Sequence, residues 1–500
     1  MDSGWLLFAT IAVPLAACLT MMAIPSQYKD AIRWVALAAG FTMFVLSVIV
    51  FAVYNYKDGG LQFDLRLPWL EDVAFFQKDG ITLHLAVDGI SVPLVLLTGI
   101  VILSGVFISW NIEYRNKDFF ILLMLLVSGV FGVFESMDLF FLFFFYELAV
   151  LPMYLLIGVW GASSHFGTYT RTKEYGAMKL ALYLVGGSVL IFIGIFAVFV
   201  EADKGTFDLS VLGQVTYSET FQKTFFPFFL LGFGVLAGLW PFHTWSPDGH
   251  VAAPTAVSML HAGVLMKLGA FGIIRVGMTL FPEGAQFWAP ALLVLGTTGA
   301  LYGAISAMAQ RDLKYVVGYS SVSHMGYVLM GLATLNPIGV NGAVLQMFAH
   351  GVMTALMFAM VGAVYDQTHV RDMTIFGGLS QRMPRFTAFF AIAGLSSLGL
   401  PGLAGFIAEF NIFVGLFKEY PVFGALGILA AAITAVYILR MLAMAFFGPL
   451  NEKWAHLKEM RLLEQVGGAI LIGFIVFMGV WPDPFVDRIS QSVLALPGIS

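Results

Sequence analysis

The chain carries a long series of apolar segments, each of the length that a helix needs to cross a lipid bilayer. Such a helix takes about 20 apolar residues. Only 11% of the residues are charged and 59% are hydrophobic, whereas about 25% of the residues in a soluble domain are charged. The sequence therefore predicts an all-α polytopic membrane protein with about fourteen transmembrane helices, near residues 5–24, 31–54, 84–110, 118–135, 138–160, 176–200, 225–246, 252–280, 288–309, 312–333, 338–364, 386–416, 421–448 and 463–484.

The lysine and arginine residues of the predicted loops are distributed unevenly between the two sides of the membrane. If the first loop lies inside, the inside loops hold fourteen of these residues and the outside loops hold seven. Cytoplasmic loops of membrane proteins carry the excess of positive charge. The pattern predicts that both termini lie outside, which agrees with an even number of helices.

Two of the predicted helices are interrupted by proline and glycine. The seventh is interrupted at residues 238–241 and the twelfth at residues 400–405. These helices are five apart, so two five-helix units that contain them would have opposite orientations. Broken helices at matching places in two halves indicate an inverted-repeat transporter with its site near the membrane midplane. The alternative is that proline and glycine only kink these helices, which is common in membranes.

The two interruptions also suggest how the chain is divided. Each predicted repeat contains one broken helix, and the remaining helices lie before and after the repeats. The predicted parts are the first two helices with an outside loop (1–80), the third helix (81–117), a first five-helix repeat (118–280), a second five-helix repeat (288–448), and an inside loop with the fourteenth helix (449–500).

Three ionisable residues lie deep inside predicted helices. Lys267 is the only cation between Lys223 and Arg275, Glu147 follows a run of aromatic and leucine residues, and Glu409 follows the second interruption. A charged side chain at the bilayer centre costs about 2.5–3.5 kcal/mol on insertion scales, so such a residue is a functional candidate by default. All three are candidates for taking up and releasing protons. The alternatives are a protonated Glu147 bonded to a neighbouring helix and a Glu409 that caps the broken half-helix.

Two further charged residues lie near the ends of predicted helices. Lys179, near the start of the sixth helix, is either a counter-charge for Glu147 or a side chain that extends to the inner surface. Asp88 opens the third helix, where an aspartate is typical of an N-terminal cap.

Histidines are concentrated in and beside the central helices. Histidine titrates near neutral pH and can relay protons, although a lone histidine in an apolar helix is more often a hydrogen-bonded packing group. His250, beside Asp248 in a predicted turn, is interpreted as a loop residue. The spacings do not match the clustered ligands of a metal site, so no metal is predicted. The relay candidates are His243, His261, His324 and His350.

Other kinds of chemistry find no support in the sequence. Cys18 is the only cysteine, which excludes disulfides, iron–sulfur ligation and paired-thiol redox chemistry within this chain. The net charge is −5 with no polybasic run, so nothing indicates binding of nucleic acid. No phosphate loop, dinucleotide fingerprint or nucleophile elbow occurs. Movement of charge through a membrane is the function that remains.

Several long motifs resemble, in the same order, those of the antiporter-like subunits of respiratory complex I (NADH–quinone oxidoreductase). The resemblance covers about residues 80–450. It is greatest to the chain 4 type, subunit M, because Glu409 is acidic where the L and N types are expected to carry a lysine. The motifs are VDGIS (87–91), FYELAVLPMYLLIGVWG (145–161), PFHTWSPDGHVAAPTAVS (241–258), LMKLGAFGIIR (265–275), DLKYVVGYSSVSHMGYVLMG (312–331), LQMFAHGVMTALMF (345–358) and LPGLAGFIAEF (400–410).

The resemblance implies a proton-translocating subunit of a respiratory membrane arm, in the inner (plasma) membrane of a bacterial cell beside subunits of the L and N types. Glu147 matches the uptake-side glutamate, Lys267 the central lysine and Glu409 the exit-side glutamate. His324 and His350 match polar positions along the axis between them. Quinone reduction elsewhere in the complex would drive the protonation changes along these residues. Flavin, iron–sulfur clusters and quinone are expected in other subunits, so no cofactor is predicted in this chain.

One position departs from the family pattern. Leu236 stands where the family usually carries a lysine, two residues before the first break, as the partner of Glu147. Three explanations are open: His243 or His261 replaces the lysine, Lys179 alone pairs with Glu147, or the subunit couples proton movement to quinone reduction in a different way. The rival functions are a subunit of a multisubunit Na⁺/H⁺ antiporter, the membrane subunit of a membrane-bound hydrogenase, and a non-pumping scaffold.

Overall fold

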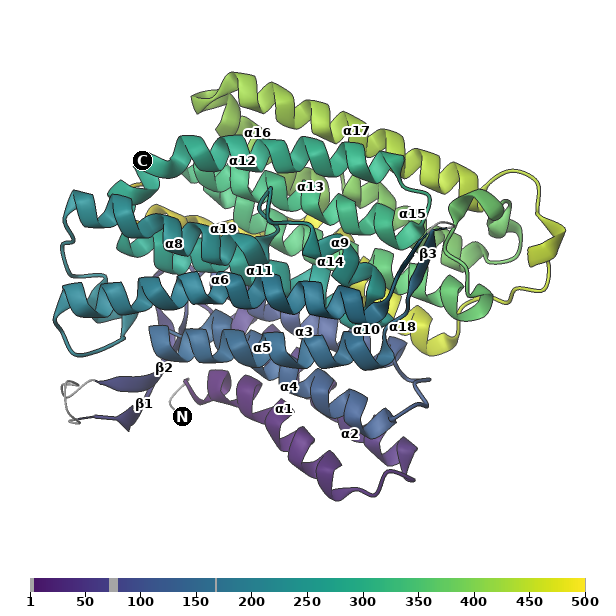
Figure 1. Ribbon diagram of the computed structural model, residues 1–500, viewed down its shortest axis with the longest axis horizontal. Helices are drawn as coiled ribbons and strands as arrows, with labels where there is room; N and C mark the ends of the chain where they lie inside the picture. The colour runs from purple at the N-terminus through teal and green to yellow at the C-terminus, as the bar shows by residue number, and fades with distance from the viewer. Residues whose placement is uncertain (1–3, 72–79, 167–168, 500) are drawn as a thin grey trace.

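The computed structural model describes residues 4–71, 80–166 and 169–499. Among these residues, twelve helices are long and apolar enough to cross a membrane. The other two predicted spans correspond to α13 (Leu313–Ala333) and to an interrupted pair, α15 (Pro384–Ser397) and α16 (Ala404–Glu419). The prediction of an all-α membrane-spanning bundle is confirmed (Figure 1).

The N-terminal part consists of three helices and a β-hairpin. The prediction that the third span begins near residue 84 is wrong, because strand β2 continues to Val87 and α3 starts only at Ser91. Strand and helix are both apolar here, and hydropathy alone does not separate them. The elements are α1 (Trp5–Ala23), α2 (Lys29–Val53), the antiparallel pair β1 (Gln62–Leu70) and β2 (Ile81–Val87), and α3 (Ser91–Ile108).

The first repeat contains five spans. The fifth, Thr255–Met278, alternates between α-helical and π-helical turns. Its elements are α4 (Asn116–Glu135), α5 (Leu139–Trp160), β3 (Ser164–Phe166), β4 (Tyr169–Arg171), α6 (Lys173–Ala202), α7 (Leu209–Leu212), α8 (Glu219–Ala237), α9 (Trp245–Ala252), α10 (Thr255–Leu260), η1 (His261–Leu265), α11 (Met266–Gly272) and η2 (Ile273–Met278).

The second repeat follows directly and is succeeded by two C-terminal helices. Besides α13, α15 and α16, its elements are α12 (Pro282–Ala309), α14 (Pro337–Thr368), the short 3-10 turns η3 (Met373–Ile375) and η4 (Leu379–Gln381), and α17 (Pro421–Phe446). The C-terminal part contains η5 (Glu452–Trp454), α18 (Leu462–Val480) and α19 (Asp483–Leu494).

Both predicted interruptions are present. In the first, α8 ends before Gly238, whose φ is +79°, and α9 begins only at Trp245. In the second, Gly399 and Gly402 separate α15 from α16 with φ values of +76° and +91°. Glycine adopts such left-handed φ values without the clash that a Cβ would cause, so the chain leaves the helical path at these positions.

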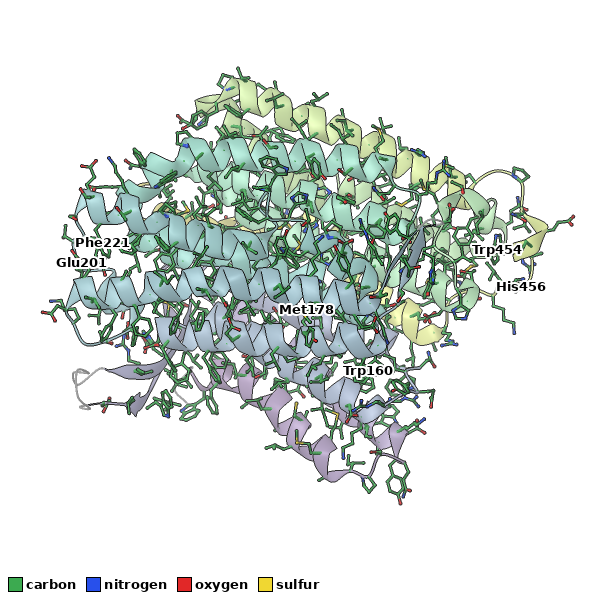
Figure 2. All side chains as sticks on the ribbon, in the orientation of Figure 1. Trp160, Met178, Glu201, Phe221, Trp454 and His456 are labelled. Atoms are coloured by element: carbon green, nitrogen blue, oxygen red, sulfur yellow. The ribbon has the colours of Figure 1, made fainter. Side chains whose placement is uncertain are left out.

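The bundle has two ends, which are called here the hairpin face and the loop face. The hairpin face carries β1–β2 and lies at the left of Figure 1, and the loop face carries β3–β4 and the segment before α18 at the right. In Figure 2, Glu201 lies at the hairpin face, His456 at the loop face and Met178 part-way along α6 between them. Met178 is 48% exposed, as expected of a side chain that faces lipid.

The two repeats carry the same backbone arrangement at opposite faces. Asp138 caps the N-terminus of α5, and Asp312 caps that of α13. Asp138 is bridged to Asp208, and Asp312 to Asp372, each by two backbone hydrogen bonds of 2.7–2.9 Å between their neighbours. The first bridge lies at the hairpin face, and the second comes five spans later at the loop face. The same capped and bridged arrangement recurs after an odd number of spans and therefore at the opposite face. This supports the predicted inverted repeats.

Candidate functional site

Lys267 lies at the centre of the bundle, on α11. Residues 256–278 are all buried, and the Lys267 side chain is 0% exposed. Its Nζ donates to the backbone carbonyl of Ala262 and to Nδ1 of His350, the latter at 2.7 Å. The π-helical turn η1 precedes α11, and π turns within helices occur frequently at functional sites. Among the described residues no carboxylate bonds Lys267, so its partner is an imidazole that can accept its proton.

His350 leads to a second group of polar side chains around Glu409. The ring centroids of His350 (α14) and His324 (α13) are 5.3 Å apart. Nδ1 of His324 lies 3.2 Å from Oε1 of Glu409, and Nε2 lies 2.9 Å from Oγ of Ser397. Nε2 of Gln346 lies 3.2 Å from Nδ1 of His324 and 3.5 Å from Oε1 of Glu409. All five residues are buried, so the structure brings the predicted site residues His324 and Glu409 together in a shared set of hydrogen bonds, with the ring of His350 beside them.

The second break shapes the surroundings of Glu409. A Cβ on Gly399 would lie 3.1 Å from Oε2 of Glu409, so the unwound backbone passes beside the carboxyl group. The contacts of that group are with the side chains described above. Leu403 occupies the N-cap position of α16 and makes no side-chain capping bond. A capping role for Glu409 therefore finds no support.

The prediction that His250 is a loop residue is wrong. It lies on α9 and is completely buried, with Nε2 3.0 Å from Oγ of Ser246. Its ring centroid lies 4.1 Å from that of His261, which is also completely buried on η1. The polar PDGH segment reads as a turn in the sequence, but burial against the helices that follow makes it helical. Within the described residues, neither ring nitrogen of His261 has a hydrogen-bond partner.

His243 lies inside the first break, between α8 and α9. Its ring packs on Tyr302 at a centroid distance of 4.9 Å and is 2% exposed. In the part of the chain that the structure describes, both of its ring nitrogens lack a partner. Leu236, the position of the family's usual lysine, is completely buried on α8. His243 and His261 thus both have ring nitrogens available to take over from the missing lysine.

Lys179 is not the counter-charge of Glu147, and that alternative is wrong. Its Nζ bonds Oδ2 of Asp248 at 2.8 Å, while Arg171 bonds Oδ1 at 2.5 Å and the Tyr315 hydroxyl donates to Oδ1 at 3.0 Å. Two cations therefore share one buried carboxylate. Asp248 was not predicted as a site residue because its cationic partners are 69 and 77 residues away in the sequence.

Glu147 lies on α5 at the side of the bundle and is only partly buried. Ser188 on α6 lies within hydrogen-bonding reach of its carboxyl group, and its Oε1 has no partner among the described residues. The neighbouring Phe144 is 47% exposed. The structure thus places Glu147 near the outer surface of the chain and apart from the hydrogen bonds of Lys267.

A buried ion pair joins the start of α3 to the end of the Lys267 segment. The carboxylate of Asp88 accepts from the backbone N–H groups of Ile90 and Ser91 at 3.0 Å, which confirms the predicted cap. It also pairs with Arg275 at 2.7 Å, and both side chains are less than one-tenth exposed. The cap was recognisable from the sequence, but the partner was not, because it belongs to a segment almost two hundred residues away.

Three comparisons relate this fold to known proteins. The family described as "NADH:quinone oxidoreductase/Mrp antiporter, TM" matches residues 136–434. NAD(P)H-quinone oxidoreductase chain 4-2 of Synechocystis sp. is 36% identical over 448 residues, which cover 88% of this chain and 77% of the relative. A chain 4 of Nostoc sp. is 35% identical over 490 residues, which cover 95% and 88%.

Two solved structures have the same fold as this chain. A chain of respiratory complex I from Thermus thermophilus with bound NADH superposes with a TM-score of 0.87 at 25% identity, covering 98% of this chain and 99% of that one. A chain of the Mrp complex from Dietzia sp. has a TM-score of 0.85 at 17% identity over 99% and 97%, which shows the shared fold. This chain belongs to the NADH:quinone oxidoreductase/Mrp antiporter family of membrane subunits, and within it to the chain 4 type.

Proposed function

We propose that this chain is a proton-translocating membrane-arm subunit of a respiratory NADH–quinone oxidoreductase. One observation carries the proposal: buried Lys267 bonds His350, whose ring lies beside the hydrogen-bonded pair of His324 and Glu409. These titratable side chains form a line from the first repeat into the second. Proton relays in pumps and transporters are built from ionisable side chains of this kind inside the membrane.

In this proposal Lys267 passes a proton to Nδ1 of His350, the atom that its Nζ already contacts. The transfer leaves a neutral amine, which is easier to accommodate in an apolar interior than an ammonium group. His324 is the next titratable group, since its ring centroid lies 5.3 Å from that of His350. His324 then delivers the proton to Glu409, 3.2 Å away. Exporting one proton against 100 mV requires about 2.3 kcal/mol, and quinone reduction elsewhere in the complex supplies it.

The proposal includes an orientation and a set of partners. The hairpin face is placed outside the inner (plasma) membrane of a bacterial cell, because the loops of the opposite face carry most of the lysine and arginine. Subunits of the L and N types adjoin this chain, and the partly exposed Glu147 supports a contact with one of them. Flavin, iron–sulfur clusters and quinone are bound by those other parts of the complex, since one cysteine cannot hold a cluster.

The rival functions receive less support. The two relatives named above, at 36% and 35% identity, are chains 4 of NAD(P)H-quinone oxidoreductases, whereas chains of the Mrp complex and of a membrane-bound sulfane sulfur reductase match at 17% and 22%. A non-pumping scaffold would not need an uncompensated lysine at its centre, which is costly to bury.

The Glu409→Gln variant tests the proposal. Glutamine has the size of glutamate and keeps its hydrogen-bonding contacts, but it cannot take up the proton. Quinone-dependent acidification of inside-out vesicles is therefore expected to fall by roughly tenfold or more. A tenfold loss corresponds to an increase of about 1.4 kcal/mol in the activation barrier of pumping. The control is Glu419→Gln, an exposed residue on the same helix, which should pump normally. Normal pumping by Glu409→Gln at matched subunit content would contradict the proposed exit step.

The His261→Phe variant tests what replaces the lysine missing at position 236. His261 is buried in the segment that leads to Lys267, and phenylalanine can keep its ring packing on Trp245, 5.1 Å away. Pumping is expected to fall several-fold. It should fall by more than in His243→Phe, because His243 packs against Tyr302 in the first break and is not part of the segment that contains Lys267. The exposed His456→Phe is the control. Unchanged proton uptake in His261→Phe would rule out this residue as the replacement.

A further inference from the structure

A polar cavity of about 820 Å³ lies at the loop face, away from Lys267 and Glu409. Strand β3 of the first repeat lines one part of it, and the segments at the ends of α12 and α14 in the second repeat line the rest. Sites for small molecules enclose about 300–1,000 Å³, so this cavity has room for more than a single ion. Its ionisable lining residues are His165, Arg311, Asp312, His369, Arg371 and Asp372.

Two of these groups are already paired with each other. Nε of Arg371 lies 3.1 Å from Oδ2 of Asp312. The other guanidinium nitrogens of Arg371 donate to the carbonyl of Val251 and to Oγ of Ser164. Oδ1 of Asp312 accepts from two backbone N–H groups at the start of α13. The pair is therefore satisfied within the chain and leaves no charge for a ligand.

Arg311 is exposed and, among the described residues, forms no ion pair and no side-chain hydrogen bond. An arginine just after a helix often bonds the last carbonyls of that helix. Here those carbonyls have other partners. The carbonyl of Met308 accepts from Arg440 at 2.8 Å, and that of Ser306 accepts from the Gln310 side chain at 3.1 Å. The guanidinium of Arg311 thus keeps its five N–H donors for a molecule in the cavity.

Two histidines supply further donors. His369 follows α14, with its ring centroid 5.8 Å from that of Tyr365. His165 on β3 uses Nδ1 in a contact with Oγ1 of Thr170. In the part of the chain that the structure describes, the remaining ring nitrogens of these two residues have no hydrogen-bond partner. An imidazole donates one N–H when neutral and two when protonated, so both side chains can bond an oxygen-rich group.

Asp372 leaves one carboxylate oxygen free. Its Oδ1 accepts from the backbone N–H and the hydroxyl of Thr374 at 2.9 and 2.7 Å, whereas Oδ2 has no partner among the described residues. The segment that carries Asp372 is bonded to that of Arg311, because the backbone N–H of Met373 donates to the Arg311 carbonyl at 2.9 Å. A cation and a carboxylate thus line the same cavity on adjoining segments without pairing.

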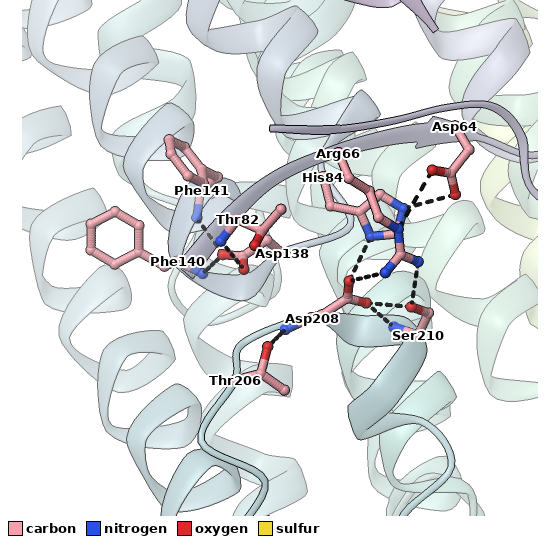
Figure 3. A network of polar contacts seen from close by, with 10 residues as sticks. All are labelled: Asp64, Arg66, Thr82, His84, Asp138, Phe140, Phe141, Thr206, Asp208 and Ser210. Atoms are coloured by element: carbon pink, nitrogen blue, oxygen red, sulfur yellow. Dashed lines mark hydrogen bonds and ion pairs between the residues drawn. The ribbon is translucent and has the colours of Figure 1, made fainter. Parts of the chain in front are cut away.

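The corresponding network at the hairpin face is closed by its own residues. Figure 3 shows Arg66 and His84 beside Asp64 and Asp208. Arg66 lies 3.3 Å from Asp208 and 3.5 Å from Asp64. The ring nitrogens of His84 lie 2.8 and 3.1 Å from the same two carboxylates. Each of these donors has a carboxylate partner, whereas Arg311 has none, so free charges of this kind distinguish the loop-face network.

An apolar strip of α12 leads to the cavity. Tyr302 and Ile305 are 41% and 51% exposed, and Ala309, which is also exposed, lines the cavity. Residues spaced by three and four positions share one face of a helix. Exposed apolar side chains on a membrane-spanning helix contact lipid, so the strip connects the hydrocarbon region with the polar cavity at the end of the helix.

We infer that this cavity binds the headgroup of a phospholipid that carries both a phosphate and an ammonium group, with an acyl chain along the strip of α12. The phosphate accepts from Arg311 and His369, since a guanidinium forms paired bonds with phosphate oxygens. The ammonium group donates to Oδ2 of Asp372. Because the charges of Arg311 and Asp372 are opposite and unpaired, a headgroup with both charges complements them better than a purely anionic one.

The test uses the assembled complex, purified in detergent, and a phosphatidylethanolamine with a photoreactive acyl chain. Illumination is expected to label α12 near Ile305 and Ala309. Arg311→Gln and Asp372→Asn should each lower this labelling several-fold, and the asparagine oxygen can still cap the turn that follows it. The control is Arg382→Gln, because Arg382 is an exposed arginine of the same face that forms no ion pair among the described residues. This variant should be labelled like the wild type.

Competition experiments identify the part of the lipid that is recognised. Unlabelled phosphatidylethanolamine should displace the photoreactive lipid, phosphatidylglycerol should displace it less, and inorganic phosphate should not displace it. Displacement by inorganic phosphate would show that the cavity takes a free anion and would overturn the lipid site. Equal displacement by phosphatidylglycerol would rule out the contact between the ammonium group and Asp372.

Two further outcomes would overturn the inference as a whole. One is unchanged labelling in both Arg311→Gln and Asp372→Asn. The other is a wild-type complex in which α12 is not labelled, as when a neighbouring subunit fills the cavity. Lipid binding does not depend on proton translocation, so Glu409→Gln should be labelled as strongly as the wild type even where it no longer pumps.

Discussion

Replacing Lys267 by methionine is expected to abolish most proton pumping and to slow quinone reduction in the assembled complex. Methionine fills a similar volume, but the contact with Nδ1 of His350 at 2.7 Å is lost and no proton can be handed on. A loss of roughly a hundredfold in pumping, about 2.7 kcal/mol, is expected because no other cation lies in this buried segment before Arg275. Acidification of inside-out vesicles and quinone-reductase turnover, measured together, check the prediction.

A second substitution distinguishes a proton carrier from a fixed charge. Lys267→Arg keeps a cation at this position but cannot release a proton, so it is expected to fail almost as completely as methionine. Lys223→Met, near the hairpin end of α8 with a partly exposed side chain, should behave as wild type. Pumping that survives in Lys267→Arg but not in Lys267→Met would show that only the charge matters.

Breaking the pair of Asp88 and Arg275 is expected to cause the largest loss of stability in the chain. Removing one partner of a buried, hydrogen-bonded ion pair costs about 3–5 kcal/mol, because the other charge remains buried without compensation. Asp88→Asn leaves Arg275 in this state and also weakens the cap of α3. The subunit content and the melting temperature of the purified complex are both expected to fall.

An exposed ion pair and a double variant serve as controls for this loss. Asp118→Asn breaks the contact of Asp118 with Arg115 at the opposite face, where the two side chains are 43% and 53% exposed. It should change the melting temperature little, because surface pairs contribute little to stability. The double variant Asp88→Asn/Arg275→Gln should be more stable than Asp88→Asn alone. Equal losses in the single and double variants would show that the cap, and not the uncompensated charge, is responsible.

The sequence by itself determined which segments cross the membrane and where two of them break. These properties are local, because they depend on the hydropathy of about 20 consecutive residues and on glycines such as Gly238 and Gly399, where a positive φ needs no distant partner. The sequence also pointed to Lys267 and Glu409, because an ionisable residue in an apolar helix is conspicuous whatever surrounds it.

Only the tertiary structure decided what each of these groups contacts. Lys267 meets His350 across 83 residues of sequence, and Lys179 meets Asp248 across 69 and not Glu147 across 32. The helix-like hydropathy of residues 84–87 gave no sign that they pair with β1, and His84 meets Asp208 only because the chain returns after 124 residues. Hydrogen bonds and ion pairs act over about 3 Å, and folding selects which of many polar residues come that close.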